Sequence, residues 1–197
     1  MHPTQLLIST RNQHKLDEIH AIMSGMPIEL LSLAAFPLAP EVIEDADTLE
    51  GNASKKSEQL FAFAGLATVA DDTGLEVMAL DGAPGVYSAR FAGESSTDQQ
   101  NRDLLLTRLD GVQDRQAQFR TVIAFTTGAG TFLFEGSCKG RIARSETGTN
   151  GFGYDSIFIP DGFTQSFAEM DADQKNQISH RSRALKRFSS YLSSIVE

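Results

Sequence analysis

The stretch LATVADDTGLEV, residues 66–77, carries the strongest indication of the fold. An apolar run stops at two adjacent acids, Asp71 and Asp72, and a hydroxyl and Gly74 follow. The run predicts a short buried strand over residues 66–70, and the residues after it predict that the strand ends at the acids. Two neighbouring carboxylates repel each other and are rarely buried unpaired. This strand end is therefore either a ligand site or a polar turn.

Strands and helices alternate on the N-terminal side of this stretch. Residues 5–9 and 28–33 have the composition of short strands, and residues 14–26 repeat apolar side chains at helical spacing. Asp47, followed three residues later by a glutamate, resembles a capping box that begins a helix ending near Gly65. This β-α-β-α-β order is typical of an α/β protein.

The C-terminal half combines helices with antiparallel strands. Residues 97–109 are predicted to form a helix, and residues 117–146 contain alternating segments separated by turn residues, typical of hairpins. A glycine-rich stretch over residues 148–160 leads into a short strand, and residues 180–196 place apolar side chains on one helical face. We expect one domain that covers residues 1–197.

Composition excludes several classes of protein. The chain has 197 residues, of which 41% are hydrophobic, so it can bury a sizeable core. Its 17 basic and 26 acidic residues give a formal net charge of −9, which argues against a nucleic-acid partner. Cys138 is the only cysteine, and no apolar run is long enough to span a membrane. With no signal-peptide pattern at the start, we expect a cytoplasmic protein without a membrane partner.

The two acids suggest a metal site. At a strand end of an open α/β sheet they would face the crevice where ligands bind. A hard cation such as Mg²⁺ prefers oxygen ligands and would relieve the repulsion between them. Adjacent strand residues point to opposite faces, so only one of Asp71 and Asp72 is expected to face a ligand. Glu44 would add a second ligand if it folds back over Asp72. A polar turn is the alternative.

Three further stretches suggest contacts with an anion or a base. Residues 9–19 place a lysine, Lys15, at a helix start, where free amides attract phosphate, although no Walker motif is present. In residues 148–155, glycines allow close approach to a ligand and two aromatic rings offer flat faces. Residues 175–183 gather cations before and at a helix start, where a bound anion would offset them. The alternatives are a capped turn, a hairpin loop and a solvated basic patch.

Taken together, six stretches resemble the dITP/XTP pyrophosphatase family, the HAM1-like or RdgB-like non-standard purine nucleoside triphosphate pyrophosphatases. In chain order they are STRNQHKLDEI, DTLEGNASKK, ADDTGLEV, GAPGVYSARFAG, GTNGFGYD and SHRSRAL. Each stretch alone is common, but six in this order are specific. The resemblance implies an elongated α/β fold, with a mixed central β-sheet flanked by helices and two lobes with a substrate cleft between them. It also implies a homodimer.

The resemblance further implies a Mg²⁺-dependent reaction. ITP, dITP and XTP would be cleaved to the monophosphate and pyrophosphate by attack of water on the α-phosphate. Asp72 would accept the proton and, with Glu44, hold the metal. Lys15, and with it Lys55, would stabilise the departing pyrophosphate. A site that donates hydrogen bonds to the purine 6-carbonyl would reject adenine.

The resemblance implies substrate contacts as well. They are Thr10, Arg11, Asn12, Gln13, His14 and Lys15 along the triphosphate, Thr73 through its hydroxyl, and Phe152, Gly153, Tyr154, Asp155, Lys175, His180 and Arg181 elsewhere on the nucleotide. Two other functions fit the same residues. One is a Maf-like nucleotide pyrophosphatase that acts on other bases, and the other is a purine-nucleotide sensor without catalysis.

Overall fold

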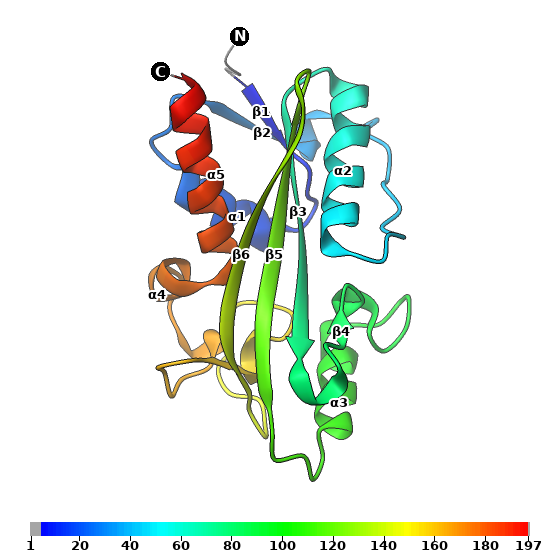
Figure 1. Ribbon diagram of the computed structural model, residues 1–197, viewed down its shortest axis with the longest axis vertical. Helices are drawn as coiled ribbons and strands as arrows, with labels where there is room; N and C mark the ends of the chain where they lie inside the picture. The colour runs from blue at the N-terminus through cyan, green and yellow to red at the C-terminus, as the bar shows by residue number, and fades with distance from the viewer. Residues whose placement is uncertain (1–4, 197) are drawn as a thin grey trace. The chain divides into compact units, whose positions relative to one another are not determined.

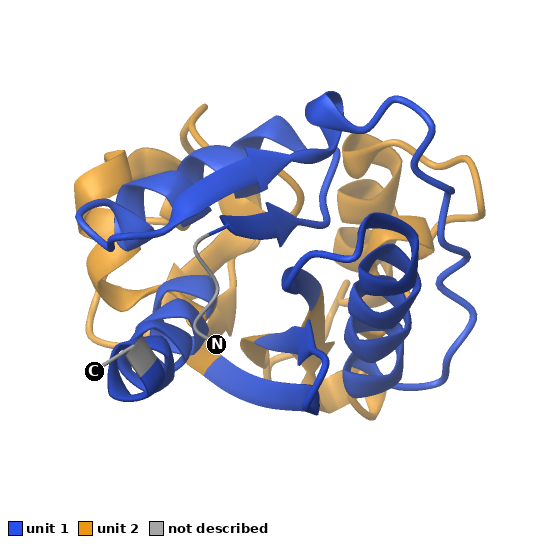
Figure 2. Cartoon of the chain, turned by 90° about the horizontal axis from the view of Figure 1, so that it is seen from above, with its two compact units in different colours: residues 1–72, 121–136, 181–197 blue, residues 73–120, 137–180 orange. Residues whose placement is uncertain are grey.

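The computed structural model describes residues 5–196, and the contacts divide the chain into two compact units (Figure 2). Unit 1 comprises residues 1–72, 121–136 and 181–197, and unit 2 comprises residues 73–120 and 137–180. Each unit is thus assembled from segments that lie far apart in the sequence. The expectation of one domain over residues 1–197 stays a prediction.

The helices and strands are labelled in Figure 1. In chain order they are β1 (Gln5–Ile8), α1 (Gln13–Met23), β2 (Glu29–Ser32), α2 (Leu49–Ala64), β3 (Thr68–Val77), β4 (Pro84–Gly85), α3 (Asp98–Arg108), β5 (Gln116–Thr127), β6 (Gly130–Ile142), β7 (Phe158–Pro160), α4 (Ala172–Ile178) and α5 (His180–Val196).

Unit 1 is built on strands in the order β2-β1-β3-β5-β6. β1 pairs in parallel with both β2 and β3. Parallel strands are normally covered on both faces, and here Leu6 and Ile8 pack with apolar residues of α1 and α5, while Leu7 packs with Leu60 of α2. Helices therefore cover the two faces of β1, which explains why its sequence is apolar without alternation.

Unit 2 contains the remainder of β3, β5 and β6, with β4 antiparallel to β3 and β7 antiparallel to β6. Its core is rich in aromatic rings. Phe119 lies edge-on to Phe158, with ring centroids 4.7 Å apart, and Phe167 lies 5.1 Å from Phe158. Leu105 of α3 is fully buried in the same cluster. These residues anchor α3, β7 and the segment that follows β7 to the strands.

Most sequence predictions of element type are confirmed. The structure has strands within residues 5–9 and 28–33 and helices within residues 97–109 and 180–196. α1 begins one residue before the predicted range of 14–26 and ends three residues before its end. β5 and β6 are neighbouring strands joined by a two-residue turn at Gly128 and Ala129, so the predicted antiparallel hairpin is present (Figure 1).

The predicted end of the central strand is wrong. β3 does not stop at residue 70 but continues through Asp71 and Asp72 to Val77. Gly74 marks a close approach of two backbones instead of a turn, because a Cβ atom there would lie 2.6 Å from the carbonyl oxygen of Gly85 in β4. The acids therefore lie inside a strand, where both are buried.

Three smaller predictions are also corrected. The cap of α2 is Thr48, whose hydroxyl accepts a hydrogen bond from the Gly51 amide at 3.1 Å, so the predicted start at Asp47 is one residue early. The short polar helix α4 was not predicted, because it lacks an apolar period. β6 continues unbroken to Ile142, where a turn was expected after residue 140.

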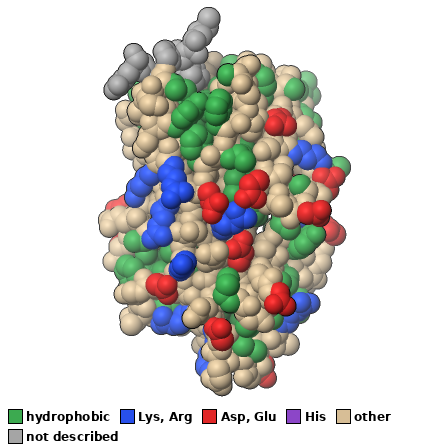
Figure 3. Space-filling model, in the orientation of Figure 1, with side chains coloured by type: hydrophobic (Ala, Val, Ile, Leu, Met, Phe, Trp, Pro, Cys, Tyr) green, Lys and Arg blue, Asp and Glu red, His purple; other side chains and the backbone are tan. Residues whose placement is uncertain are grey.

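The surface carries both acidic and basic side chains (Figure 3). On the face shown in Figure 3, acidic and basic side chains are intermixed. Among residues 5–196, no helix combines the length with the apolar composition that crossing a bilayer requires.

Gly74→Ala tests the close approach of β3 and β4. We expect the added methyl group to lower the free energy of unfolding by about 1–3 kcal/mol, since the atoms that it meets belong to a backbone. Urea unfolding followed by circular dichroism measures the change. Gly128→Ala is the matched control, because nothing lies within 4 Å of a Cβ atom there. Equal stability of the two variants would contradict this account.

Candidate functional site

The two acids of β3 belong to separate polar clusters in unit 1. Asp71 contacts Lys15 of α1 and Arg181 of α5, whereas Asp72 accepts a hydrogen bond from Asn52 of α2. Because adjacent strand residues point to opposite faces, each acid meets the helices on its own side of the sheet. The prediction that the pair would face in different directions is confirmed.

Asp71 is held by cations. Its Oδ2 atom lies 3.0 Å from Lys15 Nζ and accepts a hydrogen bond of 3.2 Å from Arg181 Nε. Arg181, which is 1% exposed, also forms an ion pair with Glu18. Burial acts to raise the pKa of Asp71, but Lys15, Arg181 and Lys56 outweigh it and hold that pKa far below its usual value. Asp71 is therefore an anion that fixes two cationic side chains.

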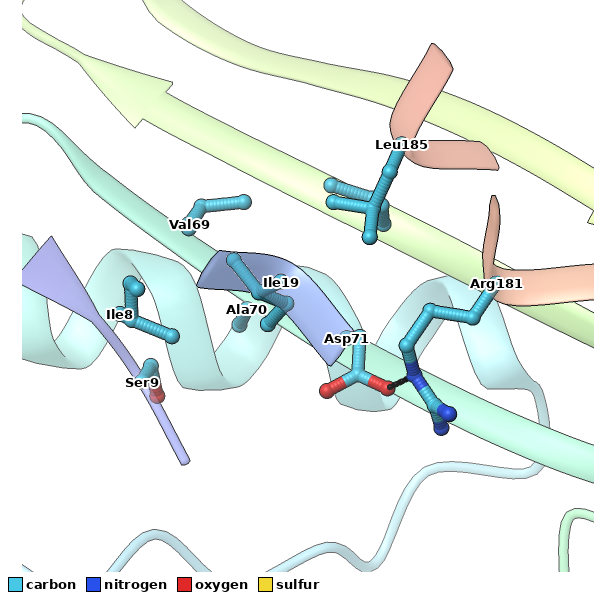
Figure 4. A pocket seen from close by; sticks show the side chains of 9 residues that line it. Ile8, Ser9, Ile19, Val69, Ala70, Asp71, Arg181 and Leu185 are labelled. Carbon is cyan, nitrogen blue, oxygen red and sulfur yellow. Dashed lines mark hydrogen bonds and ion pairs between the residues drawn. The ribbon is translucent and has the colours of Figure 1, made fainter. Parts of the chain in front are cut away.

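Apolar side chains line one side of this ion pair (Figure 4). In the close-up, the carboxylate of Asp71 points toward the guanidinium of Arg181, and Val69 and Leu185 line the same small pocket. Removing Arg181 would leave Asp71 with Lys15, and removing Asp71 would leave Arg181 with Glu18, so either change weakens a buried charge network without emptying it. This pair thus ties the start of α5 to the middle of β3.

Asp72 is neutralised less completely. Asn52 Nδ2 donates to Asp72 Oδ2 at 3.1 Å, and Lys56 Nζ lies 3.9 Å from Asp72 Oδ1. The same ammonium lies 3.3 Å from Glu44 Oε1 and donates to the backbone carbonyl of Asp71 at 2.5 Å. Burial raises the pKa of Asp72 and the charge of Glu44 adds to it, while Lys56 opposes both. Asp72 and Glu44 thus meet around one lysine.

This donor set suits a magnesium ion that binds together with a substrate. Among residues 5–196 there is no group of three or more His, Cys, Asp or Glu side chains that could hold a metal. Mg²⁺ commonly takes one or two carboxylates and completes its shell with water and phosphate oxygens. Asp72 and Glu44 supply that number, and a cation would relieve the cost of ionising Asp72.

The start of α1 is a capped turn, which is the alternative given above to an anion site. The side chain of Asn12 accepts a hydrogen bond from the Lys15 amide at 3.2 Å, and the Asn12 amide donates to Thr10 Oγ1 at 3.2 Å. Arg11 donates to the carbonyl of Ala39 at 3.2 Å. The exposed pair Gln13 and His14 completes the predicted set along the triphosphate. The cap satisfies one amide of the helix start, and phosphate binding by the others stays a prediction.

A second buried ion pair lies in unit 2. Lys175 Nζ donates to Asp155 Oδ2 at 2.7 Å, and the same oxygen accepts a hydrogen bond from the Phe152 amide at 3.0 Å. The Lys175 ammonium lies 5.1 Å from the centre of the Phe152 ring. His180 stacks on Phe119 with centroids 4.5 Å apart. The position of the half-buried Phe152 ring is therefore fixed by the Asp155 carboxylate and the Lys175 ammonium.

Tyr154 differs from Phe152 in its surroundings. It is 5% exposed, packs in the core of unit 2, and donates its hydroxyl to the carbonyl of Ser88 at 2.8 Å. Burial raises the pKa of this hydroxyl above its usual value. Thr73 is half-buried on β3, next to Asp72 in the sequence. Of the two aromatic faces expected for a base, the structure leaves Phe152 the more accessible.

Unit 1 thus contains Thr10 to Lys15, Glu44, Asp72 and Arg181, and unit 2 contains Thr73, Phe152 to Asp155, Lys175 and His180. The roles of Asn52 and Lys56 were missed. Lys55 was named instead, and its Nζ pairs with Asp45 at 2.5 Å. A signal was available, because Asn52 and Lys56 lie at helical spacing within the apolar stripe that begins at Leu49.

The raised pKa of Asp72 predicts how stability depends on pH in metal-free protein. An unperturbed aspartate ionises near pH about 3.9. The folded protein holds this proton more tightly than the unfolded chain, so ionisation of Asp72 lowers stability as the pH rises from there toward the folded pKa. Asp72→Asn removes this loss. We expect its Tm to match that of the original protein in acid and to exceed it increasingly toward neutral pH.

Thermal unfolding with a chelator present, across the acid-to-neutral range, measures this difference. Asp161→Asn removes an exposed carboxylate elsewhere in the chain and is the matched control. An Asp72→Asn variant that is less stable than the original protein at neutral pH would contradict the prediction.

Comparison with known proteins gives a consistent result. The model of the Ham1 family matches residues 6–191. The dITP/XTP pyrophosphatase of Shouchella clausii is 48% identical over 184 residues, covering 92% of both chains. The dITP/XTP pyrophosphatase of Geobacter sulfurreducens is 46% identical over 192 residues, covering 96% of both.

Solved structures agree. The Ham1 protein of Staphylococcus aureus superposes with a TM-score of 0.88 at 37% identity, covering 96% of this chain and 98% of that one. A nucleoside-triphosphatase / dITP/XTP pyrophosphatase of Mycobacterium abscessus gives a TM-score of 0.75 at 41% identity, covering 93% and 98%. These matches confirm the resemblance and the mixed α/β fold, a curled mixed sheet flanked by helices. The chain belongs to the Ham1 family.

Proposed function

We propose that this protein is a hydrolase that cleaves the non-standard purine nucleoside triphosphates dITP, XTP and ITP to the monophosphate and pyrophosphate. The relatives described above are named dITP/XTP pyrophosphatases, and they are similar over nearly the whole chain. The observation that carries the proposal is the arrangement of Asp72 and Glu44 around the ammonium of Lys56. Carboxylates and a cation gathered at one point suit the hydrolysis of a phosphate anhydride.

Asp72 is proposed to accept the proton of the attacking water. The hydrogen bond from Asn52 fixes the orientation of its carboxylate, and general-base catalysis depends on such positioning. Mg²⁺ held by Asp72 and Glu44 would neutralise charge on the phosphates and make a bound water more acidic. The number of carboxylates fits a cation that is shared with the substrate.

Lys15 is proposed to stabilise the charge that develops on the departing pyrophosphate. The position of its ammonium is restricted, because it lies 3.0 Å from the Asp71 carboxylate, which also accepts a hydrogen bond from Arg181. A donor that is already oriented costs little reorganisation when charge develops. The amides at the start of α1, after the cap at Asn12, add a positive potential for the triphosphate.

Base recognition is proposed for the loop of residues 148–155 in unit 2, called the Phe152 loop below. The ring of Phe152 offers a face for stacking, and Lys175 and Asp155 supply a donor and an acceptor beside it. Donors aimed at a purine 6-carbonyl would be left unpaired by adenine, which disfavours it. Guanine has the same carbonyl, so its rejection must depend on the 2-position.

Homodimer assembly, a cytoplasmic location and the dependence on Mg²⁺ are parts of the same proposal. The homodimer and the dependence on Mg²⁺ come with the family resemblance, and the cytoplasmic location comes from the sequence observations, among them the single cysteine. The absence of a nucleic-acid partner is proposed from the net charge of −9.

Pyrophosphate release from ITP, XTP, dATP and dGTP, with Mg²⁺ and with a chelator, tests this function. We expect fast release from ITP and XTP only with Mg²⁺, and release from dATP and dGTP slower by about 100-fold or more. Equal rates on all four would favour a pyrophosphatase of other base specificity. Binding of ITP without any release would favour the sensor.

Asp72→Asn and Glu44→Gln test the proposed chemistry. We expect Asp72→Asn to lower kcat by about 10²–10⁴-fold, because the proton acceptor is lost. Glu44→Gln should instead raise the Mg²⁺ concentration needed for half-maximal rate. Glu41→Gln is the matched control, since it changes an exposed acid in the same loop. Full activity of Asp72→Asn would remove the proposed proton acceptor.

A further inference from the structure

Helix α3 holds the Phe152 loop through both polar groups of one residue. The Gly153 amide donates to Asp98 Oδ2 at 2.8 Å, and Arg102 Nη1 donates to the Gly153 carbonyl at 2.6 Å. Asp98 and Arg102 are four residues apart and so lie on the same face of α3. All of these residues belong to unit 2. A helix that takes both hydrogen-bonding groups of one loop residue fixes that residue in two directions.

Arg102 is itself fixed in place. Its Nε atom donates to Glu146 Oε2 at 2.9 Å, and its Nη2 atom donates to Gln99 Oε1 at 2.8 Å. Glu146 also accepts a hydrogen bond of 2.8 Å from Ser156 Oγ. Glu146 precedes the loop and Ser156 follows it, so the guanidinium connects both ends of the loop with its middle. The side chain of Arg102 is 15% exposed, which limits competition from water.

The position of Gly153 determines that of Phe152. Phe152 is its neighbour in the chain, and its amide donates to Asp155, which Lys175 holds from the other side. The ring is therefore placed by two sets of contacts. One is the Asp155–Lys175 pair, which the family resemblance already implies as part of the substrate site. The other is the pair of hydrogen bonds from Asp98 and Arg102 of α3 to Gly153, which the sequence did not predict.

We propose that Asp98 and Arg102 are positioning residues for base selection. They act through Gly153 to hold the ring of Phe152 at the position where it contacts the purine. This inference rests on the proposed function, since it takes the Phe152 loop to contact the base. The proposed chemical groups, Asp72 and Glu44, lie in unit 1, so loosening the loop should weaken binding and selectivity more than the chemical step.

The test uses Arg102→Ala, Asp98→Ala and Asp98→Asn in the full chain with saturating Mg²⁺. Asparagine keeps a side-chain oxygen that can accept from the Gly153 amide, whereas alanine does not. We expect Arg102→Ala and Asp98→Ala to raise KM for ITP about tenfold, with kcat within about twofold, and to narrow the preference for ITP over dGTP. Asp98→Asn should keep both parameters near those of the original protein.

Two controls separate positioning from general damage. Arg108→Ala removes a cation from the same helix that contacts the Phe91 ring and not the loop, so it should leave KM unchanged. Inhibition by inorganic tripolyphosphate, which has no base, should be the same for all variants. If Arg102→Ala does not fold, Arg102→Lys and the two Asp98 variants still provide the comparison.

The outcomes decide the inference. Unchanged KM and selectivity in Asp98→Ala and Arg102→Ala would overturn it. Equal losses for every substrate and for tripolyphosphate, or equal losses in Asp98→Asn and Asp98→Ala, would show a merely structural role and also overturn it. If the original protein releases no pyrophosphate from ITP, the proposed function itself has failed and this inference falls with it.

Discussion

Two adjacent carboxylates inside β3 impose the constraint on which unit 1 depends. A strand sends neighbouring side chains to opposite faces, so the carboxylates of Asp71 and Asp72 meet different helices. Each therefore needs its own polar partners from the helices on its side, Lys15 and Arg181 for one acid and Asn52 and Lys56 for the other. The positions of α1, α2 and α5 against the strands are tied to these pairs as well as to the apolar core.

The two acids are neutralised unequally, and this difference is what suits the site to chemistry. Asp71 is paired closely with two cations, and its pKa is held far below the usual value against the effect of burial. Asp72 has a neutral amide and a more distant ammonium that it shares with Glu44, and its pKa is raised. A buried carboxylate that is costly to ionise lowers stability unless a cation arrives with the ligand. Asp71 thus holds neighbouring cations in place, and Asp72 is the acid that we propose binds the metal and accepts the proton.

The sequence predicted the local features of this site well and its long-range pairings poorly. Apolar periodicity identified α1 and α5, and strand geometry alone predicted that the two acids diverge. The predicted end of β3 was wrong because a glycine can either form a turn or leave room for a neighbouring backbone. The sequence does not distinguish these two uses, and Gly74 has the second, next to Gly85. The bond between Asp71 and Arg181 joins residues 110 positions apart, and no pattern in a single sequence encodes such a pair. The hydrogen bonds between α3 and Gly153 were not predicted either, because they also join residues far apart in the sequence.

The glycine-rich loop shows how a correct motif can have a different physical cause from the one first assigned to it. Its glycines were expected to let a ligand approach the backbone. A Cβ atom at Gly151 would instead lie 2.1 Å from Asp155 Oδ2, and one at Gly148 would lie 2.3 Å from the backbone of Ala168. These two glycines therefore make room for the protein's own groups. Without a side chain at residue 151, the Asp155 carboxylate can fold back to the Phe152 amide while it still reaches Lys175. The glycines that were expected to admit a ligand therefore build a fixed loop, which is what the proposed discrimination between purines requires.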